Sequence, residues 1–181
     1  SFQQDNIACL PADKVTSAMD DRRISIRELR EHQRHNWPAA YRNNHPAVLR
    51  LLRVADDYRR LSGELLSSLS LQHGEFNVLA ALKRQPYPHR VTPTALCKAL
   101  LISSGGLTKL LKRLEAAGLI ERPENPEDGR SQLVQLRPEG ARLAEAAMTK
   151  LCDLQATWLA PLNEEQRGQL DQLLELLEDR H

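Results

Sequence analysis

The sequence predicts a mainly α-helical fold with a small β-hairpin inserted beyond the middle of the chain. The 181 residues contain 18 Gly and Pro residues, and 11 of these lie within residues 86–140. On either side, residues 47–85 and 141–181 carry leucines at helical spacing, which is typical of long amphipathic helices. An Asp-Gly pair, Asp128 and Gly129, lies between two strand-like runs and marks a hairpin. We therefore expect long helices around a compact, turn-rich lobe.

The helices before the hairpin follow from their start and stop signals. A long helix is predicted after Pro46, because leucines recur at helical spacing as far as Leu69. A second helix follows Gly74 and ends before Pro86, since the residue before a proline disfavours helical geometry. A third begins at Thr92, an N-cap residue that is followed by proline at the first helical position.

The remaining elements are predicted in the same way. Ser103 caps a fourth helix, which ends at a glycine C-cap, Gly118. The runs LIERPEN and SQLVQLR are expected to form the strands of the hairpin, with the Asp-Gly pair as its turn. Pro138 begins another long helix. Asn163 caps the last one, and a glutamine three residues later completes a capping box.

Composition and charge exclude several classes of protein. The chain is 41% hydrophobic and 27% charged with a net charge of +1, which is typical of a folded, soluble domain. No apolar run approaches the roughly 20 residues that a membrane span needs, and no signal peptide is visible, so we expect a cytoplasmic protein without membrane contact. The three cysteines are widely spaced, which argues against a disulfide scaffold or zinc knuckle.

The balanced net charge hides a polarity along the chain. Residues 138–181 carry four basic and nine acidic side chains, whereas residues 103–114 carry three basic side chains and no acidic one. A polyanionic partner is therefore compatible with the near-neutral total.

Two short helices followed by a two-stranded hairpin are the layout of a winged helix-turn-helix. In the helix after Ser103, four leucines from Leu107 to Leu114 form one apolar stripe, at about 100° per residue. The opposite side presents Thr, Lys and Arg. These residue types suit a DNA major groove, because Thr and Lys can reach the base edges and the cations can neutralise phosphates. The side chains expected on this side are Thr108, Lys109, Lys112 and Arg113. An ordinary amphipathic surface helix is the alternative.

The hairpin supplies a second candidate contact with DNA. Arg130 follows the Asp-Gly pair, so it is expected to project into solvent, as a side chain that enters a minor groove must. Asp128 would brace the turn that presents it. Plain turn chemistry is the alternative role for Asp128.

The run LTKLLKRLEAAGLIERPENPEDGRSQLVQLRPEG resembles the MarR family of bacterial transcriptional regulators. The resemblance covers roughly residues 46–181. It implies a homodimer whose winged lobes are held by a bundle of terminal helices and bind a pseudo-palindromic duplex. By this resemblance Ser104 joins the residues that face the major groove, and Arg130 faces the minor groove.

The N-terminal 45 residues resemble the extension of the urate-responsive, PecS-like branch of that family. Trp37 and Arg122 match two positions of the branch's urate site, whereas Asn77 and Leu110 stand where the branch has aspartate and arginine. The resemblance implies a small aromatic or phenolic effector, rather than urate, that is bound near Trp37, Asn77 and Arg122. In the alternative reading, Trp37 and Tyr41 only anchor the extra helix.

The domain organisation follows from these assignments. Residues 1–45 are expected to form an extension with an extra helix, residues 46–72 and 139–181 a helical dimerisation region, and residues 73–138 the DNA-binding lobe. A leucine stripe on the last helix supports dimerisation without reference to any family. The stripe consists of Leu170, Leu173, Leu174 and Leu177.

The expected function is that of a homodimeric transcriptional repressor that a small ligand releases from DNA. One alternative is a redox-sensing regulator that switches through Cys97, and another is a winged-helix module that binds proteins. No catalytic constellation or phosphate loop is visible, so we expect neither an enzyme nor a cofactor. His32 and His35 lack a third ligand at suitable spacing, so no metal site is expected either.

Overall fold

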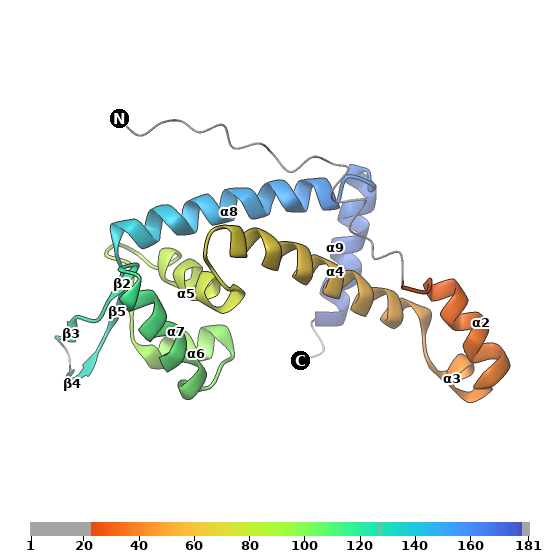
Figure 1. Cartoon of the computed structure of the whole chain (residues 1–181), viewed down its shortest axis with the longest axis horizontal. Helices are drawn as coiled ribbons and strands as arrows, with labels where there is room; N and C mark the ends of the chain where they lie inside the picture. Colours follow the sequence, from red (N-terminus) through yellow and green to blue (C-terminus); the bar gives the residue numbers. More distant parts are fainter. Residues whose placement is uncertain (1–22, 127, 179–181) are drawn as a thin grey trace. The chain divides into compact units, whose positions relative to one another are not determined.

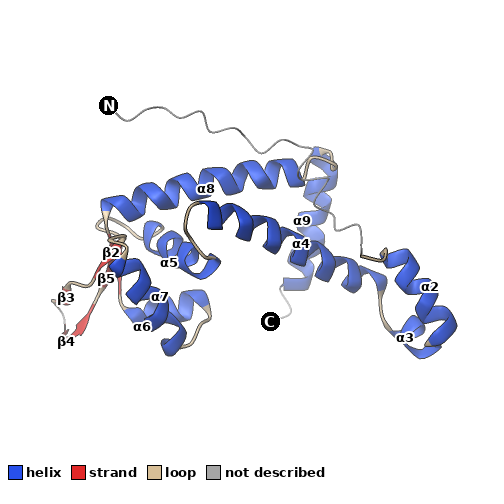
Figure 2. Ribbon diagram, in the orientation of Figure 1, coloured by secondary structure: helices blue, strands red, loops and turns tan. Residues whose placement is uncertain are grey.

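The computed structural model describes residues 23–126 and 128–178 and is mainly α-helical with two small sheets (Figure 1). The strands are short and lie in the part of the chain between α7 and α8 or just before α6 (Figure 2). The predicted fold class is confirmed. The helices are α2 (Ile26–Asn36), α3 (Pro38–Asn43), α4 (Pro46–Ser68), α5 (His73–Lys83), α6 (Pro93–Leu100), α7 (Ser104–Ala116), α8 (Pro138–Trp158) and α9 (Glu164–Glu178). The strands are β1 (Arg90–Val91), β2 (Ile120–Glu121), β3 (Glu124–Asn125), β4 (Asp128–Gln132) and β5 (Val134–Leu136).

The chain divides into two compact units, residues 59–152 and residues 1–58 with 153–181. The first of these is a winged helix-turn-helix. Helices α5, α6 and α7 pack on one another, and an antiparallel sheet of order β1-β5-β2 closes the group. The β3–β4 hairpin extends away from the helices as the wing (Figure 1). Fully buried leucines from each of the three helices, among them Leu79, Leu96 and Leu107, form the core with Val134 of β5.

The caps that define the helix-turn-helix are those that the sequence predicts. The Thr92 hydroxyl accepts a hydrogen bond from the Ala95 N–H at 3.2 Å, and the Ser103 hydroxyl accepts one from the Gly106 N–H at 3.2 Å. Leu101 ends α6 in the left-handed conformation, and α7 follows at a bend of 111°. No single helix of the described residues is long and apolar enough to span a bilayer. Helices α6 and α7 reach the required length and apolar composition only when they are taken together across their bend.

The predicted position of the hairpin turn is wrong by two residues. Asp128 already pairs with Asn125 across the hairpin, and Gly129 lies within β4, so the Asp-Gly pair is not the turn. Pro126 follows Asn125 in the turn, where its fixed φ near −65° suits the first central position of a common β-turn. Arg130 therefore belongs to the body of β4 rather than to the tip of the wing.

In the second unit, the described part of the N-terminal extension, residues 23–45, contains α2 and α3. Trp37 and Pro38 separate α2 from α3, because proline cannot continue the helix before it. Arg23 ties the extension to α4, where its guanidinium pairs with Asp56 at 2.7 Å and with Asp57 at 3.0 Å. None of the residues of α2, α3 or α9 is buried.

Candidate nucleic-acid interface

Helix α7 has an apolar inner face and a cationic outer face. Leu107, Leu111 and Leu114 are 1–2% exposed and pack into the core of the winged lobe. Lys109 and Lys112 lie on the opposite side and are exposed, and no ion pair to either is found among the residues that the structure describes. The outer face of α7 therefore offers two positive charges to an anionic partner.

The first turn of α7 adds small polar groups to this face. Ser104 and Thr108 are exposed, and the Thr108 hydroxyl donates to the Ser104 carbonyl at 2.8 Å. Because that hydroxyl hydrogen is used within the helix, Thr108 presents acceptor lone pairs outward. At Gly105 an added Cβ would meet no atom within 4 Å, so a partner can come close to the backbone there.

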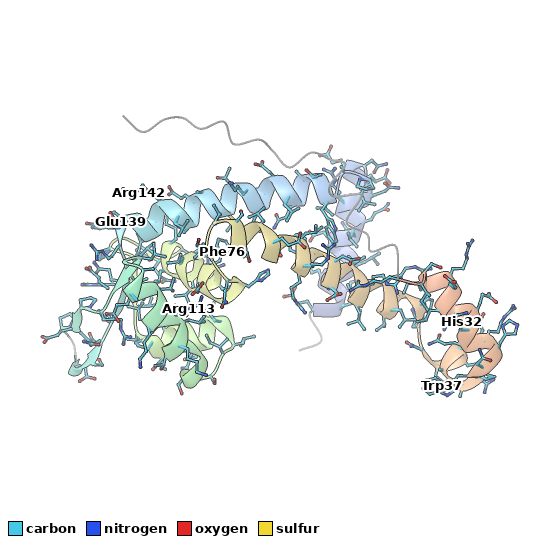
Figure 3. The ribbon with its side chains drawn as sticks, viewed as in Figure 1. His32, Trp37, Phe76, Arg113, Glu139 and Arg142 are labelled. Atoms are coloured by element: carbon cyan, nitrogen blue, oxygen red, sulfur yellow. The ribbon has the colours of Figure 1, made fainter. Side chains whose placement is uncertain are left out.

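Arg113 lies on the flank of α7 that faces α5, and not at the centre of the outer face (Figure 3). Its Nε donates to the buried Glu75 Oε1 at 2.9 Å, and its Nη1 donates to Gln72 Oε1 at 3.0 Å. Neither partner of Arg113 is predicted by the polar pattern of α7. The Gln72–Glu75 spacing is that of a capping box, and this was the available signal.

The wing is braced by Ser131. The Asn125 amide donates to the Ser131 hydroxyl at 3.0 Å, and that hydroxyl donates to the Asp128 carbonyl oxygen at 3.1 Å. Asp128 is exposed at the start of β4, and Arg130 lies two residues further along the same strand. The hydrogen bonds stiffen the strand that carries Arg130.

The three residues predicted to bind an effector lie on different elements. Trp37 is 66% exposed at the junction of α2 and α3 in the unit that contains the extension (Figure 3). In the winged unit, Asn77 is exposed on α5, and Arg122 follows β2 with its Nε donating to the Leu133 carbonyl at 3.2 Å. Their role in ligand binding stays a prediction.

The cysteines and histidines form no cluster in the described part of the chain. Cys97 on α6 is half-buried and Cys152 on α8 is exposed, and both thiols are free. Cys9 lies outside the described residues. Across residues 23–126 and 128–178, no three His, Cys, Asp or Glu side chains come together as metal ligands. A redox role for Cys97 stays a prediction.

Two carboxylates of α8 have lowered pKa values. A hydrogen bond from its own backbone N–H lowers the pKa of Glu139, and the charges of Arg142 and Arg137 lower it further (Figure 3). The Lys83 ammonium, 2.7 Å from Glu145, lowers the pKa of the latter through a hydrogen bond and its charge. Lys83 and Glu145 border a hollow of about 140 Å³ between α5 and α8. Neither carboxylate belongs to α7 or the wing.

A cationic helix in a winged helix-turn-helix is the arrangement of a DNA-binding regulator. A family model described as MarR family matches residues 67–131. The chain is 33% identical over 124 residues to the HTH-type transcriptional regulator PecS of Dickeya dadantii, which covers 68% of this chain and 75% of the relative. It is 40% identical over 86 residues to the multiple antibiotic resistance protein MarR of Salmonella typhimurium, covering 48% of this chain and 58% of the relative. The chain belongs to the MarR family.

Solved structures agree with this assignment. A mutant of MarR from E. coli complexed with operator DNA matches with a TM-score of 0.64 at 31% identity, over 73% of this chain and 93% of that one. AbsC from Streptomyces coelicolor, a MarR family transcriptional regulator, matches in fold with a TM-score of 0.65 at 20% identity, over 74% and 90% of the two chains. The chain is thus a DNA-binding transcriptional regulator, and because members of this family are not enzymes, the expected lack of catalytic activity is confirmed.

Proposed function

We propose that this MarR-family regulator binds a pseudo-palindromic operator as a homodimer, represses transcription there, and leaves DNA when a small aromatic or phenolic ligand binds. The observation that carries the proposal is the outer face of α7, where Lys109 and Lys112 stand exposed without an acidic partner among the described residues. In the major groove these side chains would reach phosphates and base edges. The wing would place Arg130 at the adjacent minor groove, with Asp128 bracing the strand.

Unpartnered leucines support the homodimer. In α9, Leu173 is 62% exposed and Leu177 is 54% exposed, although they belong to one helical stripe. A contiguous apolar stripe on the surface marks an interaction site. A two-fold symmetric dimer would bury it twice and would present two recognition helices to successive turns of DNA.

The proposal is tested by selecting duplexes from a random pool with the full-length protein and measuring the affinity for the selected duplex at several salt concentrations. We expect a dimer that protects a pseudo-palindrome. Its affinity should fall steeply with salt, because each neutralised phosphate releases counterions. A monomeric species in sedimentation, or an affinity that does not change with salt, would contradict the proposal.

Lys112→Ala and Arg130→Ala are expected to weaken DNA binding without a change in thermal unfolding. A lost base contact should cost about 1–3 kcal/mol and relax specificity at one position, whereas a lost phosphate contact should weaken all duplexes alike. Arg50→Ala, which removes one exposed positive charge from α4, is the matched control. If the double variant Lys112→Ala/Arg130→Ala binds DNA as tightly as Arg50→Ala does, α7 and the wing do not face DNA.

Ligand release is tested by titrating the protein–DNA complex with urate and with simple phenolic acids. We expect a phenolic monoanion to release DNA more effectively than urate does, because Leu110 stands where the urate-responsive branch has an arginine. An exposed indole can stack on an aromatic ring, and a guanidinium can pair with a carboxylate. Trp37→Phe separates the fluorescence of Trp37 from that of Trp158, whose ring packs against Tyr58 with centroids 5.2 Å apart and the planes tilted by 49°.

The candidate ligand residues are tested one at a time. Trp37→Ala, Asn77→Ala and Arg122→Ala should each weaken ligand binding, while DNA affinity without ligand should change little for Trp37→Ala. Unchanged ligand affinity in all three variants would place the effector elsewhere.

A further inference from the structure

We propose that Glu75 is a positioning residue for DNA binding: with Gln72 it holds the Arg113 guanidinium so that the remaining N–H donors of that group meet a DNA phosphate. The proposal rests on the proposed placement of α7 against DNA. It adds to that placement a residue that does not itself touch DNA.

Glu75 stands out because it is a buried charge. The side chain is 5% exposed, and together with Ser62 it makes up the buried polar side chains of the described residues. Removing a carboxylate from water is costly unless hydrogen bonds and an opposite charge compensate for the loss. Glu75 has both, because Oε2 accepts from the Gln72 backbone N–H at 2.8 Å and Oε1 accepts from Arg113 Nε at 2.9 Å.

The same contacts fix the orientation of Arg113. The Nε–H donates to Glu75 and one Nη1–H donates to Gln72, so hydrogen bonds at two different nitrogens hold the guanidinium plane. A guanidinium has five N–H donors, which leaves three that these contacts do not use. The side chain is 55% exposed, so a partner in solution can reach it.

A guanidinium that is held in this way is suited to phosphate. The loss of rotamer freedom has already occurred on folding and is not incurred again on binding. The planar guanidinium can donate from Nε to Glu75 and from its unused N–H groups to a phosphate oxygen, which the single ammonium of lysine cannot do in the same geometry. Arg113 also follows Lys112 directly, so it lies next to the outer face of α7.

Glu75 has a second role that the experiment must separate from this one. It caps α5, since its carboxylate lies in the first turn and accepts from the N-cap backbone. Glutamine at this position can still accept from the Gln72 N–H, so Glu75→Gln keeps the cap but weakens the hold on Arg113. A residue that only caps the helix would tolerate this change without an effect on DNA.

The test measures affinity for the selected duplex against salt concentration for Glu75→Gln, Arg113→Ala, Arg113→Lys and the double variant Glu75→Gln/Arg113→Ala. With one phosphate contact per protomer, Arg113→Ala should reduce the slope of log K against log salt by about 2 and the affinity roughly 50-fold at 0.1 M salt. Glu75→Gln and Arg113→Lys should each cost about tenfold. In the Arg113→Ala background, Glu75→Gln should cause no further loss.

Two results would overturn the proposal. One is a loss from Glu75→Gln that is as large in the Arg113→Ala background as in the wild type, because Glu75 would then act through the fold alone. The other is a Glu75→Gln protein with wild-type affinity. If Glu75→Gln does not fold, Gln72→Ala replaces it. This exposed side chain accepts the Nη1 hydrogen bond and also takes part in the capping box of α5. Its removal should cost about two- to threefold in affinity, and only while Arg113 is present.

Lys112→Ala distinguishes this inference from the proposed function. If Lys112→Ala weakens binding while the Arg113 and Glu75 variants do not, only the positioning role fails. If wild-type protein shows no salt-dependent affinity for any duplex, the proposed function itself fails.

Discussion

Replacing Leu173 and Leu177 together with glutamate is expected to convert the protein to a monomer and to reduce its operator affinity at least 100-fold. Both side chains are more than half exposed on α9 in the isolated chain. Burial of one leucine contributes about 1.5–3 kcal/mol, and a two-fold symmetric interface would contain each residue twice. The loss of four leucines therefore weakens the free energy of dimerisation by roughly 6–12 kcal/mol, before the cost of burying four carboxylates is counted.

The loss of DNA affinity follows from the loss of the second half-site. A dimer binds its second recognition helix at a high effective concentration, and a monomer lacks this advantage. Sedimentation velocity measures the oligomeric state, and anisotropy of a labelled duplex measures affinity. Gln172→Glu is the matched control, because it adds a carboxylate to the opposite face of the same helix. A double variant that stays dimeric would show that α9 is not the dimer interface.

Most of the fold could be predicted because its signals are local. Thr92, Ser103 and Asn163 cap helices in the structure as their spacing indicates, since capping depends on residues within one turn. The inner face of α7 was predicted correctly from leucine spacing alone, with Leu107, Leu111 and Leu114 all buried. Both kinds of signal are read from a few consecutive residues.

The features that the sequence did not reveal depend on choices between alternatives or on distant residues. Asp128-Gly129 is a strong turn signal, but Pro126 two residues earlier is an equally good one, and the strand pairing decides between them. The contact of Arg113 with Glu75 joins residues 38 positions apart, and amphipathic spacing assigns Arg113 simply to the polar side of α7. A buried carboxylate cannot be recognised from a helix-start pattern that most surface helices share.

Gly140→Ala is expected to destabilise the winged lobe by about 3 kcal/mol, at the upper end of the usual cost of overpacking. Gly140 is buried in the first turn of α8, and an added Cβ would overlap the carbonyl oxygen of Leu119 and lie 3.0 Å from Leu136 Cδ1. The same carbonyl accepts a hydrogen bond from the Arg137 N–H at 3.1 Å, which fixes the start of α8 to the backbone that leads into β2. A backbone oxygen cannot turn aside as a flexible side chain can. The start of α8 must therefore move, and the hydrogen bond must lengthen or break.

Gly168→Ala provides the matched control, because the same methyl group is added to an exposed glycine of α9 where it meets no atom within 4 Å. That change should stabilise the protein by up to about 1 kcal/mol, since alanine favours helix more than glycine does. Thermal unfolding at equal protein concentration should show a melting temperature that is roughly 6–12 °C lower for Gly140→Ala than for the wild type. The melting temperature of Gly168→Ala should be unchanged or slightly higher. Equal melting temperatures for the two variants would mean that α8 does not rest on the Leu119 backbone in solution. The base of the wing would then have to be held by side-chain packing alone.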